Sequence, residues 1–470
     1  MDSFNSARLG VPSGVAFAVM LACSVSVTAL AQTATPAPAS APTDPGPRSG
    51  TGSVGGALPG LGTKEVKLFN AAMGRFGEVD SVSNTIDDVP AGSNQQQGGG
   101  LGPRFNGNSC QECHIQPTIG GSGAAKNPQI SVATLDGAKN TIPPFITANG
   151  PTREARFIST PNGAPDGGVH DLFVITGRPD ATGCTITQPN FPQAIANNNI
   201  IFRIPTPLFG AGQIENVPDI NLMEDSSQIA AQQASDGIAS GVFNFSGNDG
   251  TITRFGWKAQ NKSLLIFAGE AYNVEQGVTN EVFPNEREDT PTCLINPLPE
   301  DALNLTNPGT SGFAPSDFSS DVENFAAFMR LSAGPTPVAS TSTTAAGEEA
   351  FESVGCSLCH IPTHVTGPSL FTNQSFVTFQ PFTDVALHDM GTGLEDQVSQ
   401  GSADGLQFRT APLWGIGQRI FFLHDGRTTN LLTAIEAHSS SGSEANTVIS
   451  NFNALSVTSR QDILDFLRSL

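Results

Sequence analysis

The chain has 470 residues, seven of them cysteine, and a formal net charge of −21 at pH 7. That length allows two or three domains, each with its own hydrophobic core. The negative charge argues against nucleic acid and anionic membranes as partners, and it fits a basic protein partner or simple solubility equally well.

Residues 1–31 have the pattern of a secretory signal peptide. Arg8 supplies a basic start, a mostly apolar run follows, and Ala29-Leu30-Ala31 provides an A-x-A cleavage site. The apolar run is too short and too rich in serine for a membrane span. We therefore expect an exported, periplasmic protein that is not an integral membrane protein, and a lipoprotein anchored through Cys23 is the alternative.

The next segment, residues 32–62, is rich in Pro, Ala and Gly and reads as a flexible stretch without a core-forming pattern. A helix is predicted to begin near Thr63, because apolar residues then recur at helical spacing. Residues 316–332 form a second amphipathic pattern, and residues 334–344, with two prolines, read as a linker. A helix over 459–470 closes the chain.

Two five-residue strings, Cys110–His114 and Cys356–His360, have the form C-x-x-C-H. This is the attachment site of c-type haem, in which two thiols join the haem vinyl groups and the histidine binds the iron. A redox dithiol or half of a zinc site would also use C-x-x-C. The added histidine disfavours the dithiol, and a second complete copy argues against coincidence. We predict two covalently attached haems, held by Cys110, Cys113, His114, Cys356, Cys359 and His360.

Two further cysteines, Cys184 and Cys293, lie between the haem motifs. A disulfide between them suits an oxidising compartment. Two buried free thiols are the alternative.

An internal repeat follows each haem motif. Phe202–Gln213 and Phe408–Gln418 share F-R, followed by P-L-aromatic-G-x-G-Q. The repeat lies farther from its haem motif in the first half, which indicates an insertion there. We therefore expect an enlarged N-terminal haem domain over 63–333 and a C-terminal cytochrome c-like domain over 345–470.

These strings, with their surroundings, resemble the family of di-haem c-type oxidoreductases with peroxidase-like members. Its relatives are the bacterial di-haem cytochrome c peroxidases, the di-haem enzyme of methylamine utilisation and the rubber oxygenases. The matching stretches are 102–121, 169–184, 202–219, 254–260, 387–391, 408–438 and the terminal helix. The resemblance implies a mostly α fold with irregular loops and two cytochrome c-like haem domains, the N-terminal one enlarged. It also implies a calcium ion between the domains, which the sequence assigns to no residue.

The sixth ligand of each iron decides its role, since a strong ligand makes an electron-transfer haem and an open position allows oxidant binding. His438 shares a helical face with Leu431, Ala434 and Ile435. In the resembled peroxidases this helix position carries the sixth ligand, so we expect His438 to bind the iron of His360. A satisfied core histidine is the more common use of such a position, and His424 is the alternative ligand.

The corresponding place in the first half is Gln233, a poor iron ligand, so the iron of His114 is expected to keep an open position. Glu215, just after the repeat, is the candidate acid/base for moving a proton between the oxygens of a bound hydroperoxide. A structural carboxylate is the alternative. His170 could fill the same role, bind this iron, or be structural.

Arg203 and Arg409 begin the two repeats and are candidate partners of the haem propionates, because guanidinium pairs well with carboxylate. Ordinary ion pairs are the alternative. Trp257 is a candidate electron relay between the haems and Trp414 is its rival, although both fit simple packing.

Together these features predict a peroxidase that reduces hydrogen peroxide at the N-terminal haem. Its electrons would come from an electron-donor protein or a small donor and pass through the C-terminal haem. An enzyme that cleaves an apolar substrate with dioxygen and a non-catalytic electron-transfer cytochrome are the alternatives.

Overall fold

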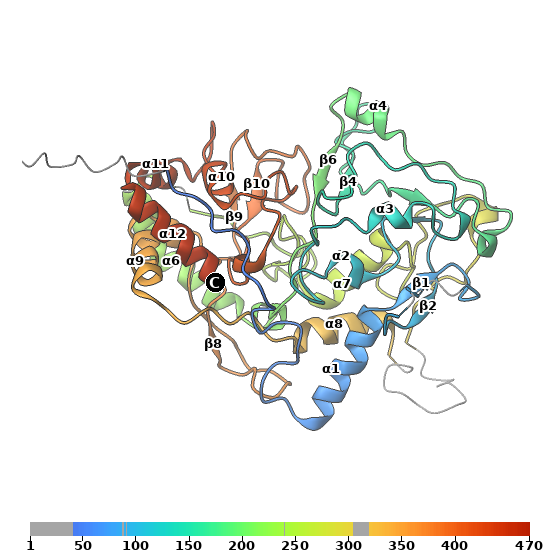
Figure 1. The fold of residues 1–470 in the computed structure, drawn as a ribbon, viewed down its shortest axis with the longest axis horizontal. Coiled ribbons are helices and arrows are strands. Elements are labelled where there is room, and N and C mark those ends of the chain that lie inside the picture. Colours follow the sequence, from blue (N-terminus) through green and yellow to red (C-terminus); the bar gives the residue numbers. More distant parts are fainter. Residues whose placement is uncertain (1–40, 87–88, 91, 239, 304–318) are drawn as a thin grey trace, which may run out of the picture. The chain divides into compact units, whose positions relative to one another are not determined.

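Short helices and small strand pairs share the described part of the chain with long irregular segments (Figure 1). The computed structural model describes residues 41–470 except 87–88, 91, 239 and 304–318. The predicted signal peptide and Cys23 lie outside the described residues.

The helices begin and end as follows: α1 (Thr63–Phe76), α2 (Cys110–Cys113), α3 (Gln129–Val132), α4 (Phe191–Ala196), α5 (Ala211–Glu215), α6 (Asp219–Ser235), α7 (Leu264–Glu275), α8 (Asp321–Leu331), α9 (Ser342–Ser353), α10 (Leu431–Glu436), α11 (Asn446–Ala454) and α12 (Val457–Ser469).

The strands form two-stranded sheets only, within the described residues. These are β1 (Val79–Ser81) with β2 (Gln97–Gly99), β3 (Arg104–Phe105) with β5 (Phe173–Val174), β4 (Glu154–Arg156) with β6 (Ile201–Arg203), β7 (His364–Val365) with β8 (Thr378–Phe379), and β9 (Leu387–Asp389) with β10 (Gln407–Arg409). Only the β1–β2 pair is parallel. The expectation of a mostly α protein is therefore only partly correct. The expected irregular loops are present, but strand pairs accompany the helices.

The predicted helices at the two ends are confirmed. Helix α1 begins at Thr63 and buries Phe69, Ala72 and Phe76, which its helical spacing places on one side. This side packs on α8, where Phe328 lies with its ring centroid 4.6 Å from that of Phe76. Helix α8 begins at Asp321, and residues 316–318 of the predicted span lie outside the described residues.

Helices α9 and α12 pack closely at the C-terminal end of the chain (Figure 1). Their contact depends on Gly347, because a β-carbon there would stand 2.0 Å from the backbone oxygen of Asp462. Phe351 and Phe466 fill the space beside this crossing, with ring centroids 5.5 Å apart. Helix α9 begins at Ser342, inside the segment expected to be a linker, because Thr341 caps it.

Helix α6 belongs to the first half of the sequence but reaches the second haem motif. The Gln233 side chain at its C-terminal end donates a hydrogen bond to the backbone oxygen of Leu358 at 2.8 Å. Just beyond the helix, Ile238 packs in one buried cluster with Phe351 and Phe382. The proposed domain boundary in the sequence is therefore crossed by core contacts.

The Pro-rich segment is held in place over its described part, 41–62, although it contains neither helix nor named strand. Asp44 forms a buried ion pair with Arg468 of α12 at 2.7 Å. The backbone N–H of Leu58 donates to the carbonyl of Leu331 at 2.7 Å. Composition alone indicated flexibility here, because it does not reveal these distant partners.

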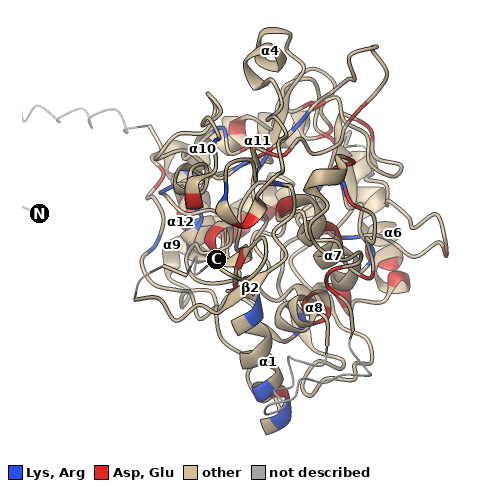
Figure 2. Cartoon of the chain, turned by 90° about the vertical axis from the view of Figure 1, so that its right-hand side faces the viewer, with Lys and Arg blue, Asp and Glu red and all other residues tan. Residues whose placement is uncertain are grey.

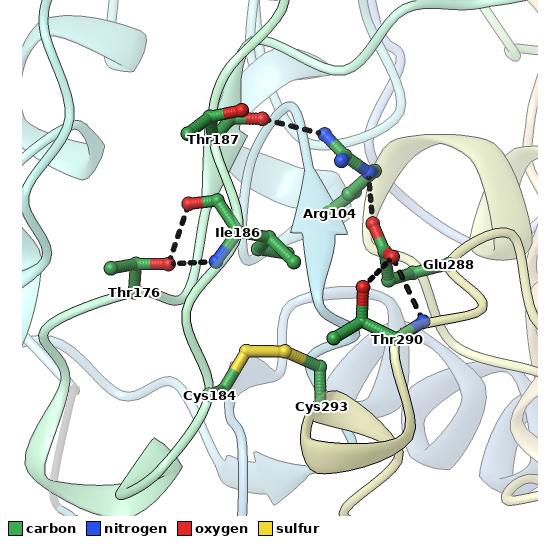
Figure 3. The surroundings of a disulfide bond; sticks show 8 residues. All are labelled: Arg104, Thr176, Cys184, Ile186, Thr187, Glu288, Thr290 and Cys293. Carbon is green, nitrogen blue, oxygen red and sulfur yellow. Dashed lines mark hydrogen bonds and ion pairs between the residues drawn. A yellow bond between two sulfur atoms is a disulfide. The ribbon is translucent and has the colours of Figure 1, made fainter.

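Cys184 and Cys293 form a disulfide, which is the first of the two alternatives that the sequence offered for them (Figure 3). Both cysteines are buried in a core cluster that includes Phe173 of β5. Nearby, Arg104 pairs with Glu288 at 2.7 Å, so a salt bridge and a disulfide both attach the segment around residues 288–293 to earlier parts of the chain.

None of the helices in the described ranges has the length and apolar character needed to cross a bilayer. Lys and Arg are sparse and are visible on α1, among other places (Figure 2).

Candidate haem sites

A pocket of about 1140 Å³ opens beside the first Cys-x-x-Cys-His motif. The two cysteines lie on the single turn of α2, and His114 follows directly. The His114 Nδ1–H donates to the backbone oxygen of Gly121 at 2.9 Å, which leaves Nε2 as the available nitrogen. Burial lowers the pKa of His114 to about 4, so the imidazole is neutral, as metal binding requires.

One face of α7 forms a wall of this pocket, with Ala268, Ala271, Tyr272 and Glu275 among its lining residues. Helix α7 is fixed at its start by Ser263, whose side chain accepts a hydrogen bond from the Ile266 N–H. The lining is otherwise rich in aromatic and aliphatic side chains, which suits a porphyrin.

Two carboxyl groups, Glu154 and Glu275, meet in this pocket through a side-chain hydrogen bond. Burial, reinforced by the charge of Glu154, raises the pKa of Glu275 well above its ordinary value. Burial opposes ionisation of Glu154 too, but Arg156, 2.6 Å away, and Arg203 outweigh it and hold the pKa of Glu154 below its usual value. Of the two carboxyl groups, Glu275 therefore keeps its proton to the higher pH, and its O–H donates the hydrogen bond to the Glu154 carboxylate.

The two catalytic candidates from the sequence, Glu215 and His170, do not line this pocket. The Glu215 carboxylate binds Arg330 at 2.6 Å and accepts from the Leu264 N–H at 2.8 Å. The His170 ring stacks on Phe157 and lies 3.0 Å from the Asp166 carboxylate. The structure thus gives both residues packing and pairing partners away from the first haem motif.

Sequence reasoning missed Glu154 and Glu275. The sequence did contain a signal for Glu275. It lies seven residues after Ala268, which places both residues on one face of a helix, and this helix follows the Arg-Phe-Gly-Trp string. Glu154 lies on β4, outside any motif, and only the strand pairing with β6 brings it opposite Arg203.

A second pocket, of about 1420 Å³, surrounds the second Cys-x-x-Cys-His motif. His360 repeats the geometry of His114, because its Nδ1–H donates to the backbone oxygen of Phe382 at 3.0 Å. Burial lowers the pKa of His360 to about 4. The motif itself forms a short 3-10 turn over Cys356–Leu358.

His438 lines the same pocket, where the sequence predicted a second axial ligand. It follows α10 by two residues, and its Nδ1–H donates to the backbone oxygen of Ala434 at 2.8 Å. Burial lowers the pKa of His438, which keeps the imidazole neutral. His438 therefore has its Nε2 available in the pocket that also contains His360.

His388 and His424 also line this pocket, and their pKa values are shifted in opposite directions. Despite burial, the Asp384 carboxylate 2.9 Å away raises the pKa of His388 well above its usual value, and a cationic imidazole is no ligand. Glu444, 2.7 Å from Nδ1, occupies the other ring nitrogen. His424 stacks on Phe408 with ring centroids 4.4 Å apart, and burial lowers its pKa to about 4.

Cys359, Asp384 and His388 form the only group of three potential metal-binding side chains found in the described ranges. Cys359 belongs to the haem motif, so this group is no separate metal site. The calcium ion that the resemblance implied therefore stays without assigned ligands among the described residues.

Two buried arginines, Arg409 and Arg419, line the second pocket. Arg409 donates to the backbone oxygen of Gly256 and Arg419 to that of Phe421, at 2.9 and 2.8 Å. No ion pair with a described carboxylate satisfies either guanidinium, and Nη2 of Arg419 has no hydrogen-bond partner there. Burial lowers each pKa to about 10.

A buried cation needs an anionic partner. The two propionates of a haem would supply this charge, so the second pocket fits the group. Arg203, the matching residue of the first repeat, lines the first pocket but already pairs with Asp396 at 2.8 Å. Its Nε still lacks a partner among the described residues.

Trp257 lines both haem pockets, and Trp414 lines neither of them. The Trp257 indole N–H donates to the backbone oxygen of Ile204 at 2.9 Å. The guanidinium of Arg419 lies 5.6 Å from its ring centroid. The structure therefore places Trp257 between the two sites.

The chain thus presents two pockets that each fit a haem. A family model described as "Di-haem oxidoreductase, putative peroxidase" matches residues 162–470, and the chain belongs to this family of di-haem oxidoreductases. The matched range contains the second haem motif, while the first lies before it.

Among solved structures, the chain is similar to hydrazine synthase of Kuenenia stuttgartiensis, studied under 20 bar of xenon. The identity is 16% over 57% of this chain and 88% of that one, with a TM-score of 0.25, too low to support an argument about the fold. A comparison with curated proteins gave no match.

Proposed function

We propose that this di-haem oxidoreductase is a periplasmic c-type peroxidase that reduces hydrogen peroxide at the His114 site with electrons received through the His360 site. The observation that carries the proposal is an unequal distribution of histidines. Of the described residues that line the first pocket, His114 is the only histidine. The second pocket adds His438, with an available Nε2, to His360.

This difference in histidines between the two pockets suits different roles for the two haems. When bound, a haem with two imidazole ligands passes electrons, and a haem with one imidazole has a position at which peroxide can be reduced. Met329, a thioether in the first pocket, lies one helical turn from Phe325, which packs on Phe76 beside His114. We therefore place Met329 on the side of the pocket that His114 occupies.

Reduction of hydrogen peroxide to two waters consumes two electrons and two protons. Glu275 is the proposed proton donor, because its raised pKa favours the protonated form and it lines the pocket. Glu154 is ionised and holds no proton of its own, so the proton that Glu275 gives up would be replaced from solvent after each transfer, while Glu154 accepts the hydrogen bond that orients Glu275. This pair takes over the acid/base role that the sequence suggested for Glu215 and His170.

Trp257 is the proposed route for electrons between the two sites. Its ring lines both pockets, and its fixed indole hydrogen bond holds it in one orientation. Arg409 and Arg419 are the proposed propionate partners at the second site.

Electron paramagnetic resonance of the purified haem-loaded protein tests the proposal. We expect one high-spin iron, with an open position, and one low-spin iron, together with peroxide-dependent oxidation of a reduced donor. Two irons that keep two protein ligands through the reaction cycle would overturn it. Oxygen uptake on an apolar substrate without any donor would instead indicate an oxygenase, and no reaction with peroxide would indicate an electron carrier.

A further inference from the structure

An exposed group of large apolar side chains surrounds the N-terminal half of α6. Its members, which we call the α6 patch, are Ile220, Met223, Phe245, Val365 and Phe376. They are 57%, 41%, 46%, 40% and 70% exposed. Single exposed apolar residues are ordinary, whereas a group of them marks an interaction surface.

Hydrogen bonds join the segments that carry the patch. The Asn221 side chain on α6 donates to the backbone oxygen of Val365 at 3.4 Å. The Phe376 N–H donates to the oxygen of Gly367 at 3.3 Å, and the Gly367 N–H donates to Asn216, just before α6. These contacts place the patch residues on neighbouring segments.

A further hydrogen bond brings Phe245 to the same place. The backbone N–H of Ile252 donates to the carboxylate of Asp219 at 2.9 Å, and Asp219 is the first residue of α6. Ile252 in turn forms a β-bridge with Phe245.

The same segments continue to the second haem site. The far end of α6 holds the motif backbone through Gln233 and Leu358, and Ile238 lines the pocket. From the other side, the His364 ring contacts the backbone oxygen of Thr383, next to Phe382, which fixes His360. A protein bound at the α6 patch would therefore contact segments that also hold the backbone around His360.

The charges on α6 and on the whole chain indicate which kind of partner protein the patch would bind. Helix α6 contains Asp219, Glu224 and Asp225 and neither Lys nor Arg (Figure 2). The whole chain is strongly acidic, with a net charge of −21. An apolar centre with a charged rim is typical of transient redox interfaces, where opposite charges speed association.

We propose that the α6 patch is the docking surface for a basic electron-donor protein. This rests on the proposed function, because it assigns the donor to the His360 side of the molecule. The proposal commits to a protein partner whose apolar contact surface is rimmed by lysine or arginine.

The test uses the haem-loaded chain with two electron donors: reduced mammalian cytochrome c, a small basic protein, and ascorbate, a small molecule. The patch variant is Ile220→Ser with Met223→Ser. The matched control is Ile142→Ser with Ile195→Ser, which removes two isoleucines that are exposed elsewhere, 43% and 39%. Stopped-flow absorbance gives the rate constant of haem reduction for each donor.

We expect the patch variant to lose at least about tenfold in the rate constant with cytochrome c and to keep its rate with ascorbate. The control should match the wild type with both donors. Glu224→Gln should weaken the ionic-strength dependence seen with cytochrome c, because charge steering is screened by salt.

Equal rates for patch variant and wild type with cytochrome c would overturn this inference and leave the proposed function intact. So would a wild type that takes electrons from ascorbate but not from cytochrome c. If the patch instead mediates self-association, the wild type will form a dimer that the patch variant loses, which also overturns it. A wild type that accepts electrons yet fails to reduce peroxide would contradict the proposed function itself.

Discussion

Among single residues, Glu275 beside Glu154 has the clearest chemical consequence. Burial and the neighbouring carboxylate raise the pKa of Glu275, and a buried acid with a raised pKa can donate its proton where a bound oxidant needs it. Removing one general acid commonly lowers a rate by roughly 10²–10⁴-fold. We expect Glu275→Gln to slow peroxide reduction by about 10²-fold while haem content and the reduced spectrum stay unchanged.

Stopped-flow mixing with peroxide measures this rate. Glu215→Gln is the control, because Glu215 binds Arg330 away from the pocket. An equal loss in both variants would show that the effect is structural rather than chemical.

Glu300 predicts a pH dependence of stability. Burial, with the charges of Glu286 and Asp301, raises its pKa to about 8. The folded state thus holds this proton more tightly than the unfolded state, where the pKa is about 4.3. Stability is therefore lost as the pH rises from about 4 to about 8, and the full cost is present above that range.

Glu300→Gln removes the charge and should stabilise the protein at pH 9 by at most about 5 kcal/mol, since the pKa rises from about 4.3 to about 8 on folding and one pKa unit equals about 1.4 kcal/mol. At pH 4 the gain should vanish. Denaturant unfolding at both pH values measures it, and Glu349→Gln, at an exposed position of α9, controls for the loss of one negative charge. A gain that is the same at both pH values would refute this account.

At this scale the sequence predicted the histidines better than the acids. His114, His360 and His438 stand out because C-x-x-C-H motifs and a helical face are local patterns. Glu154 and Glu275 meet only after β4 pairs with β6 and α7 packs beside them, so no local pattern predicts the pair, although the helical face that carries Glu275 was visible in the sequence. Arg203 and Arg409 share a motif, yet only folding brings Asp396 to one of them.

At the scale of elements, α10 is a helix of only six residues that ends two residues before His438. Asn430 caps it, because the Asn430 side chain accepts a hydrogen bond from the Thr433 N–H at 3.0 Å. Losing such a cap costs about 1 kcal/mol. We expect Asn430→Ala to lower stability by that amount and to broaden the low-spin resonance of the second haem.

Ser456→Ala is the matched control, since Ser456 caps α12 in the same way. It should cost a similar free energy of unfolding and leave the resonance unchanged. Indistinguishable spectra for the two variants would mean that α10 does not position His438.

The elements themselves were predicted unevenly. Helices α1, α8 and α12 have clear apolar periodicity, and the structure confirms them. The strand pairs of two or three residues were missed, because so short a strand has no alternation to detect. The segment 41–62 was expected to be flexible, yet the buried pair of Asp44 with Arg468 and the backbone hydrogen bond from Leu58 to Leu331 hold it.

At the scale of the whole molecule, a buried charge network joins the two halves. Asp396 pairs with Arg203 at 2.8 Å and with Lys258 at 2.9 Å, and all three side chains are at most 3% exposed. Removing the shared anion leaves two buried cations unpaired, which commonly costs about 3–5 kcal/mol.

We therefore expect Asp396→Asn to lower the free energy of unfolding by about that amount, as measured with denaturant. Asp249→Asn, which removes the more exposed partner of Lys262, is the control and should change little. Equal stability of the Asp396 variant and the wild type would show that the network does not hold the halves together.

Ile238, just beyond the end of α6, and Trp257 line the second pocket, and this bears on how the chain can be divided. A version that starts at residue 345 would lack Ile238 and Trp257, two parts of that pocket's wall. Water would reach the porphyrin through the gap, and the potential of its iron would shift, because solvent access tunes haem potentials. Any miniature electron carrier built from this C-terminal piece would need a substitute wall before it behaved like the intact enzyme.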